Sequence, residues 1–118
     1  MLSVGVDIIE IERIGRALAR WDGRFLRRVY TEAEVALCRG QVPELAVRFA
    51  GKEAISKALG TGFGEHLSWH DIEIFNDALG RPEVHLSTKI QNQFKNPKIL
   101  VSISHSTDYA SAVALWSS

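Results

Sequence analysis

The chain has 118 residues, a usual length for one domain, so we expect residues 1–118 to fold as a single unit. Hydrophobic residues make up 46% and charged residues 24% of the sequence, which is typical of globular proteins and argues against disorder along most of the chain. The 14 basic and 14 acidic residues cancel, so net charge alone indicates no class of partner.

Cysteine usage and the N-terminal segment predict the compartment. Cys38 is the only cysteine, so an internal disulfide and a cysteine zinc site are both excluded. Residues 1–7 lack the basic region and long apolar stretch of a signal peptide, and no apolar run approaches the ~18 residues that span a bilayer. We therefore expect a cytoplasmic protein that does not bind membranes.

The chain begins with an expected strand and an expected helix. Val4, Val6 and Ile8 alternate with polar or glycine residues, which is strand periodicity and places Asp7 on the face opposite these apolar side chains. From about residue 10 the apolar residues recur at helical spacing as far as Phe25, which predicts a first helix.

Two more helices are expected between residues 31 and 60. Thr31 and Glu34 fit a capping box that begins a short helix ending near Gly40. Pro43 suits the first turn of the next helix, and Gly60 suits its end. Small residues at four-residue intervals allow a neighbouring element, in the same chain or in another subunit, to approach this helix closely: Ala46, Ala50, Ala54 and Ala58.

The C-terminal half is expected to consist mainly of strands. A hairpin is predicted at residues 72–75 and 84–86, a short helix at residues 87–94, and two more strands at residues 99–104 and 110–116. Helices are clustered instead of alternating with strands. The sequence therefore predicts an α+β fold with a mainly antiparallel sheet.

Arginines dominate residues 13–28. Six arginines against one acidic residue, Asp22, give this segment a charge of 6 − 1 = +5 in a neutral chain. Four of them recur at helical spacing opposite the apolar stripe: Arg13, Arg16, Arg20 and Arg24. A solvated helix face is the ordinary explanation of such a pattern. Because a solvated face is usually mixed in sign, this almost purely basic one also indicates an anionic partner.

Three segments contain residues that could carry chemistry. Asp7 lies at the first strand-to-helix junction, Glu53 and Lys57 share one face of a helix, and His105 closes a strand. Each also has an ordinary explanation: helix capping for Asp7, a surface ion pair for Glu53 and Lys57, and a solvated position for His105. The other histidines form no motif with His105, so a multi-histidine metal site is unsupported.

Together these segments resemble the holo-acyl-carrier-protein synthase family of phosphopantetheinyl transferases. The family has a GxDI…E…RI start, a central RFxxKEAxxKALGTG run and an SISHxxxYAxAxA end. The chain reads VGVDIIEIERI, RFAGKEAISKALGTG and SISHSTDYASAVA in the same order. The resemblance covers essentially the whole chain, with no departure at a motif position.

The resemblance implies a magnesium-dependent enzyme with a phosphopantetheinyl-transferase fold. Such an enzyme moves the 4′-phosphopantetheine arm of coenzyme A to a serine of an apo acyl carrier protein, releases 3′,5′-ADP and serves fatty acid biosynthesis. Asp7 and Glu53 would bind Mg²⁺, Lys57 would stabilise phosphate charge, and the general base would be Glu53 or a water on the metal. The implied coenzyme A contacts are Arg48, Lys52, Gly60, Thr61, Gly62 and His105.

The resemblance also implies partners. An acidic carrier protein would bind the arginines at positions 13, 16, 20 and 24, and a homotrimer would form its active sites between subunits. Three alternatives compete with this interpretation: a non-catalytic module for acidic helical proteins, a small nucleic-acid binder, and a magnesium-dependent phosphohydrolase of coenzyme A. The aromatic content of 8% without a stacking motif argues against nucleic acid.

Overall fold

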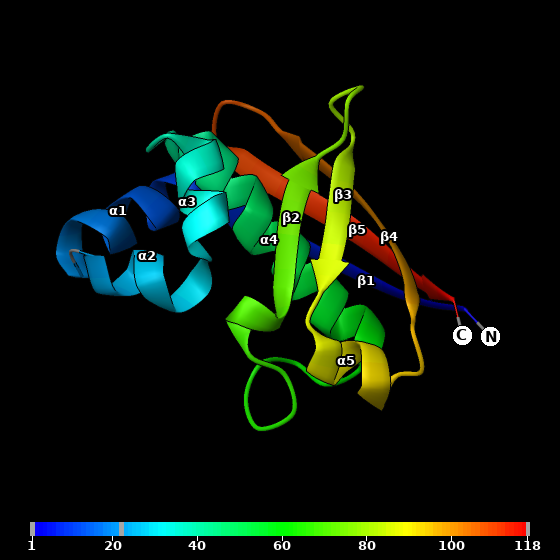
Figure 1. Ribbon diagram of the computed structural model, residues 1–118. Helices are drawn as coiled ribbons and strands as arrows, with labels where there is room; N and C mark the ends of the chain where they lie inside the picture. Colours follow the sequence, from blue (N-terminus) through cyan, green and yellow to red (C-terminus); the bar gives the residue numbers. More distant parts are fainter. Residues whose placement is uncertain (1, 22, 118) are drawn as a thin grey trace.

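A three-stranded antiparallel sheet forms one side of the molecule in the computed structural model, which describes residues 2–21 and 23–117. Its strands are β1 (Leu2–Glu10), β4 (Lys98–His105) and β5 (Tyr109–Ser117). The central strand β5 pairs with both neighbours, and Leu2 lies opposite Ser117. The first and last strands therefore lie side by side, with both chain ends at the same end of the molecule (Figure 1).

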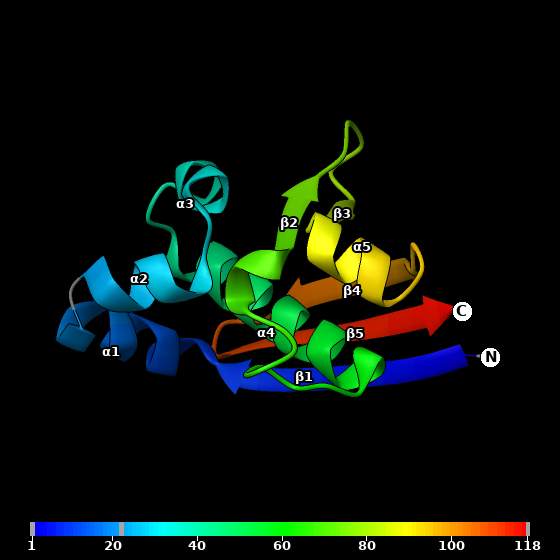
Figure 2. The same cartoon turned by 60° about the horizontal axis from the view of Figure 1, so that its bottom comes forward.

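Helix α4 (Val42–Leu59) packs along the inner face of this sheet (Figure 2). The predicted stripe of four alanines is at most 1% exposed, so it belongs to the core of the chain. Gly5 of β1 makes the close approach possible, because a Cβ atom there would overlap the carbonyl oxygen of Ala54. Small residues on both elements thus bring the β1 backbone against the helix.

A second layer covers the other side of α4. The hairpin of β2 (Ile72–Asn76) and β3 (Pro82–Leu86) contacts both α4 and the sheet, preceded by a 3-10 turn (Trp69–Asp71) and followed by α5 (Thr88–Gln93). A Cβ atom at Gly51 of α4 would lie 2.6 Å from Cδ1 of Ile74, so this contact is also close. Helix α4 is therefore enclosed between two layers, as Figure 1 shows.

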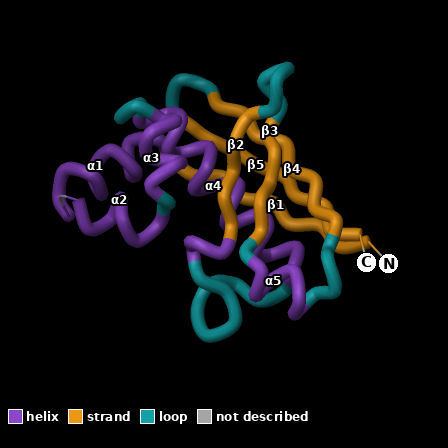
Figure 3. Tube along the Cα trace, viewed as in Figure 1, coloured by secondary structure: helices purple, strands orange, loops and turns teal. Residues whose placement is uncertain are grey.

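The remaining helices gather at one end of the molecule (Figure 3): α1 (Ile11–Trp21), α2 (Gly23–Val29) and α3 (Glu32–Cys38). The prediction that one helix continues to Phe25 is wrong, because α2 begins separately at Gly23. The break turns Phe25 inward, with its ring centroid 6.2 Å from those of both Tyr30 and Phe49. Glycine, a poor helix former, suits such a break.

The predicted capping box, the short helices, the hairpin and the α+β class with an antiparallel sheet are all confirmed. Among the described residues, no helix has the length and apolarity needed to cross a membrane.

The outer face of the sheet is apolar and exposed. Asp7 lies opposite the Val/Ile face of β1, as predicted, but it is the Asp7 face that meets α4. The outer sheet face consists of apolar side chains that are 40–72% exposed: Leu2, Val4, Val6, Ile8, Leu100, Val113 and Leu115. Contiguous exposed apolar surface of this kind usually marks an interaction site.

Candidate active site

The packing of β1 on α4 brings Asp7 to Lys57, 50 positions apart in the chain. The Lys57 ammonium donates to Asp7 Oδ1 at 3.1 Å and to the Val6 carbonyl oxygen at 2.9 Å. Glu53 lies one helical turn before Lys57, on the same face of α4. The structure thus places two carboxylates and one ammonium group at one junction of sheet and helix.

The two carboxylates repel each other. Burial and, second, the negative charge of Asp7 raise the pKa of Glu53, while the charge of Lys57 opposes that rise. The Asp7 side chain is 17% exposed and that of Lys57 is 51% exposed, so the site opens to solvent on the lysine side. A cation between Asp7 and Glu53 would relieve the repulsion.

The donor set fits Mg²⁺. This ion prefers oxygen ligands and is commonly held by one or two carboxylates, with water and substrate phosphates supplying the rest. Asp7 and Glu53 provide two such carboxylates, and no cluster of three or more potential metal ligands occurs in residues 2–21 and 23–117. The pair therefore suits a metal shared with a phosphate ligand and does not form a closed protein cage.

The segment from Gly60 to Gly62 ends α4 beside this site. Gly60 adopts φ 82°, and its amide donates to the carbonyl oxygens of Ser56 and Lys57. The amides of Thr61 and Gly62 also donate to the Ser56 carbonyl oxygen, at 3.2 and 3.3 Å. The prediction that the helix ends at Gly60 is confirmed, and these amides cap the last turn of α4. Any contact of the segment with coenzyme A stays a prediction.

Arg48 and Lys52 require a correction. Their side chains are 1% and 0% exposed, because their face of α4 lies under α3 and the hairpin. Arg48 donates to the carbonyl oxygens of Ile74 and Glu44 at 3.0 and 3.1 Å. A coenzyme A phosphate would have to break these interior contacts, so we remove both residues from the candidate site.

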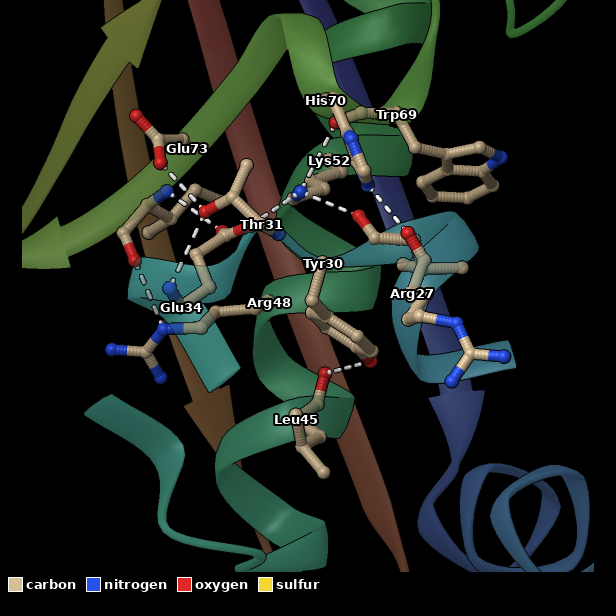
Figure 4. Close-up of polar contacts among 12 residues, drawn as sticks. Arg27, Tyr30, Thr31, Glu34, Leu45, Arg48, Lys52, Trp69, His70 and Glu73 are labelled. Atoms are coloured by element: carbon tan, nitrogen blue, oxygen red, sulfur yellow. Dashed lines mark hydrogen bonds and ion pairs between the residues drawn. The ribbon is translucent and has the colours of Figure 1, made fainter. Parts of the chain in front are cut away.

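Lys52 instead holds a buried polar network together (Figure 4). Its ammonium donates to Glu34 Oε1 at 2.6 Å and to the carbonyl oxygens of Val29 and Trp69 at 2.7 and 3.1 Å. Glu34 also accepts from the amides of Thr31 and Ile74. Burial lowers the pKa of Lys52, and the charge of Glu34 counters that effect. Sequence spacing revealed the capping role of Glu34 but not its pairing with Lys52.

His105 lies at the other edge of the sheet from Asp7. It ends β4 and pairs with Ala110 of the central strand, whereas Asp7 on β1 pairs with Ala112. Two strand spacings, about 10 Å, separate the two edges, and α4 covers the inner face between them. The structure therefore does not bring His105 to the carboxylate pair within one chain.

The predicted arginine face is exposed and runs across two helices. One hollow of about 620 Å³ on α1 is lined by Arg13, Arg16, Ala17, Ala19, Arg20 and Trp21. A second hollow of about 420 Å³ is lined by Trp21, Arg24, Phe25 and Arg28. Trp21 lines both hollows, is 49% exposed, and has the Arg20 guanidinium 5.1 Å from its ring centroid.

Sequence analysis missed this position of Trp21. Its spacing matched the apolar stripe of the first helix, but the structure leaves its ring half exposed among arginines. Trp21 lies in the last turn of α1.

Comparison with known proteins gives consistent matches over nearly the whole chain. A sequence model of the 4′-phosphopantetheinyl transferase superfamily matches residues 3–114. A holo-[acyl-carrier-protein] synthase of Protochlamydia amoebophila is 51% identical, with 99% of this chain and 98% of that protein covered. The corresponding synthase of Chlamydia pneumoniae is 45% identical, with 98% and 96% covered.

Solved structures agree with this similarity. The crystal structure of Helicobacter pylori holo-[acyl-carrier-protein] synthase in complex with coenzyme A matches with a TM-score of 0.91 and 37% identity, covering 97% of this chain and 99% of that one. The Neisseria meningitidis synthase matches with a TM-score of 0.90 and 31% identity, covering 98% of each chain.

Proposed function

Because this chain belongs to the 4′-phosphopantetheinyl transferase superfamily, we propose that it is a holo-[acyl-carrier-protein] synthase. It transfers 4′-phosphopantetheine from coenzyme A to a serine of an apo acyl carrier protein and releases 3′,5′-ADP. The observation that carries this proposal is the meeting of Asp7, Glu53 and Lys57 at one junction, in a fold shared with a coenzyme A-bound synthase.

In the reaction, the serine oxygen forms a bond to the β-phosphorus of coenzyme A, and the bond from that phosphorus to the leaving 3′,5′-ADP oxygen breaks. Lys57 is half exposed at the site and can place its positive charge on a phosphate oxygen. Either Glu53 or a water on the metal would accept the serine proton. Mg²⁺ held by Asp7 and Glu53 would supply Lewis acidity toward the pyrophosphate.

We place the acidic carrier protein on the arginine face. The face joins α1 and α2 through Trp21, and its hollows are lined by five arginines. Opposite charges at such a surface speed encounter and orient the partner. Binding of the carrier protein there would leave the Asp7 junction, between β1 and α4, open to coenzyme A.

A homotrimer with active sites between subunits also fits the geometry. The outer sheet face offers apolar surface for a second copy. His105 and Asp7 occupy opposite sheet edges, so a neighbouring subunit, not the same one, would bring His105 to the carboxylate pair. A fully active monomer in light scattering would refute the trimer.

Mass spectrometry tests the proposed activity. Purified protein is mixed with apo acyl carrier protein, coenzyme A and Mg²⁺, alone or with EDTA, and Asp7→Ala and Glu53→Ala variants run in parallel. We expect a gain of one phosphopantetheine that EDTA and both substitutions abolish. If the carrier protein still gains phosphopantetheine with both variants, the proposed activity would stand and the proposed metal site would be rejected.

The alternatives give different results in this assay. A non-catalytic module would bind the carrier protein and leave its mass unchanged. A phosphohydrolase would release 3′,5′-ADP with no carrier protein present. A cytoplasmic location, a role in fatty acid biosynthesis and a one-domain organisation over residues 1–118 stay predictions that accompany the proposed function.

A further inference from the structure

Lys57 donates a hydrogen bond to the Asp7 carboxylate, the group that a metal ion would need as a ligand. Its ammonium lies 3.1 Å from Asp7 Oδ1 and takes the Val6 carbonyl oxygen, at 2.9 Å, as a second acceptor. Both acceptors belong to β1, so the side chain reaches from the helix across to the strand. Asp7 is one of the two carboxylates that fit Mg²⁺, and the lysine now neutralises it.

An ordinary surface ion pair would be the simplest explanation. Pairs with this degree of exposure contribute little to stability, so stabilisation alone is a weak reason for the contact. The site differs from an ordinary surface because Asp7 and Glu53 repel each other there. A cation at this junction relieves that repulsion, whether it is a metal ion or an ammonium group.

We propose that Lys57 is an exchangeable counter-cation: it occupies Asp7 in the metal-free protein and moves from Asp7 to a phosphate oxygen when metal and coenzyme A bind. The proposal rests on the function proposed above. The flexible four-carbon stem of lysine permits the exchange. Since Lys57 and Glu53 share a helix face, the ammonium remains within the site after leaving Asp7.

Two consequences follow from the exchange. In the free protein, Lys57 competes with the metal for Asp7 and lowers metal affinity. Coenzyme A phosphates accept the ammonium and release Asp7, so coenzyme A and metal bind cooperatively, each raising the affinity for the other by the same factor.

The test measures Mn²⁺ binding by electron paramagnetic resonance without coenzyme A, comparing the wild-type protein with Lys57→Met. Methionine keeps much of the length of the side chain and removes its charge. We expect Lys57→Met to bind Mn²⁺ tighter, by roughly two- to fivefold, the range of exposed ion pairs. Equal or weaker binding by Lys57→Met would overturn the proposal. A Lys57→Gln variant repeats the test should the methionine variant fold poorly.

Lys89→Met is the matched control. Lys89 pairs with Asp71 Oδ2 at 3.3 Å, and its side chain is 52% exposed against 51% for Lys57. This pair joins α5 to the turn that precedes β2, whereas the Asp7 junction joins α4 to β1. Lys89→Met should bind Mn²⁺ like the wild type, and tighter binding by both variants would assign the effect to net charge and reject the exchange.

A second titration with saturating coenzyme A measures the cooperativity. The gain in Mn²⁺ affinity on adding coenzyme A should be smaller in Lys57→Met than in the wild type. An equal gain would show that Lys57 does not leave Asp7 and would overturn the proposal. Transferase activity of the wild type is scored separately by mass gain of the carrier protein, so failure of the exchange and failure of the proposed function give distinct results.

Discussion

Lys52 and Glu34 form an ion pair of 2.6 Å, Nζ to Oε1, between two side chains that are both 0% exposed. The pair ties α4 to α3, and the additional bonds of its members reach α2, the turn before β2, and β2 itself. This position explains why a lysine within the central motif is structural, although its neighbours Glu53 and Lys57 face the candidate site.

Breaking this pair should destabilise the fold. Glu34→Gln leaves the Lys52 ammonium buried without a countercharge, and such changes typically cost about 3–5 kcal/mol. Urea denaturation of the wild type, Glu34→Gln, Lys52→Met and the double variant measures the effect. The double variant should be more stable than the sum of the single changes implies. A Lys52→Met protein of wild-type stability with weakened coenzyme A binding would restore Lys52 to the site.

Gly5 sets the distance between β1 and α4. In Gly5→Ala the new methyl group would overlap the Ala54 carbonyl oxygen, so strand and helix must separate, at a cost of about 1–3 kcal/mol. Because Asp7 and Glu53 lie across this same contact, transferase activity should fall as well. Gly15→Ala is the control, since its Cβ would meet only Val42 Cγ1 at 3.8 Å and should stabilise α1 slightly. Equal behaviour of the two variants would contradict this account.

The raised pKa of Glu53 predicts a pH dependence of stability. A carboxyl group whose pKa is higher in the folded state than its ordinary value of 4.5 binds its proton more tightly when folded. Its stabilising contribution is present below that ordinary value and is lost as pH rises through the folded pKa. In EDTA, Glu53→Gln should therefore raise the melting temperature relative to wild type more at pH about 8 than at pH about 4. A larger gain at the acidic pH would reject the assignment.

The arginine face predicts a selective loss of carrier-protein binding. Arg13→Glu with Arg20→Glu places like charges opposite an acidic partner, so carrier-protein affinity should fall on the order of tenfold or more. Coenzyme A affinity should stay nearly unchanged. Lys95→Glu with Lys98→Glu makes the same change of charge at exposed residues outside this face. Surface plasmon resonance for the carrier protein and calorimetry for coenzyme A separate the two effects, and equal loss of both ligands would reject the docking face.

Trp21 should contribute to the same docking without carrying charge. Trp21→Ala removes the ring that lines both hollows and supports the Arg20 guanidinium, so the apparent affinity for the carrier protein should fall several-fold. The slope of affinity against salt should change little, unlike the slope for the arginine variants. Trp21→Phe should retain part of the affinity, and Leu37→Ala, which alters an apolar side chain 40% exposed on α3, should retain all of it. No loss in Trp21→Ala would show that docking is purely electrostatic.

Much of this protein follows from local sequence patterns. Alternation predicts β1 and β4, and helical spacing predicts α4 with its end at Gly60. Thr31 and Glu34 predict the capping box because its two residues lie only three positions apart, and each side chain accepts a hydrogen bond from the other residue's backbone amide. Such features depend on neighbours along the chain, which the sequence contains.

Which side of α4 and of β1 faces the core was decided only by tertiary structure. Arg48 with Lys52 and Glu53 with Lys57 have the same four-residue spacing on α4, yet the first pair is buried and the second borders solvent. The alternation in β1 defines two faces without identifying the inner one. The apolar face is outside because Gly5 and Asp7 must meet the helix. A helix enclosed between two layers can bury charged residues where partners such as Glu34 satisfy them. These partners are distant in sequence, so the periodicity of the helix gives no information about them.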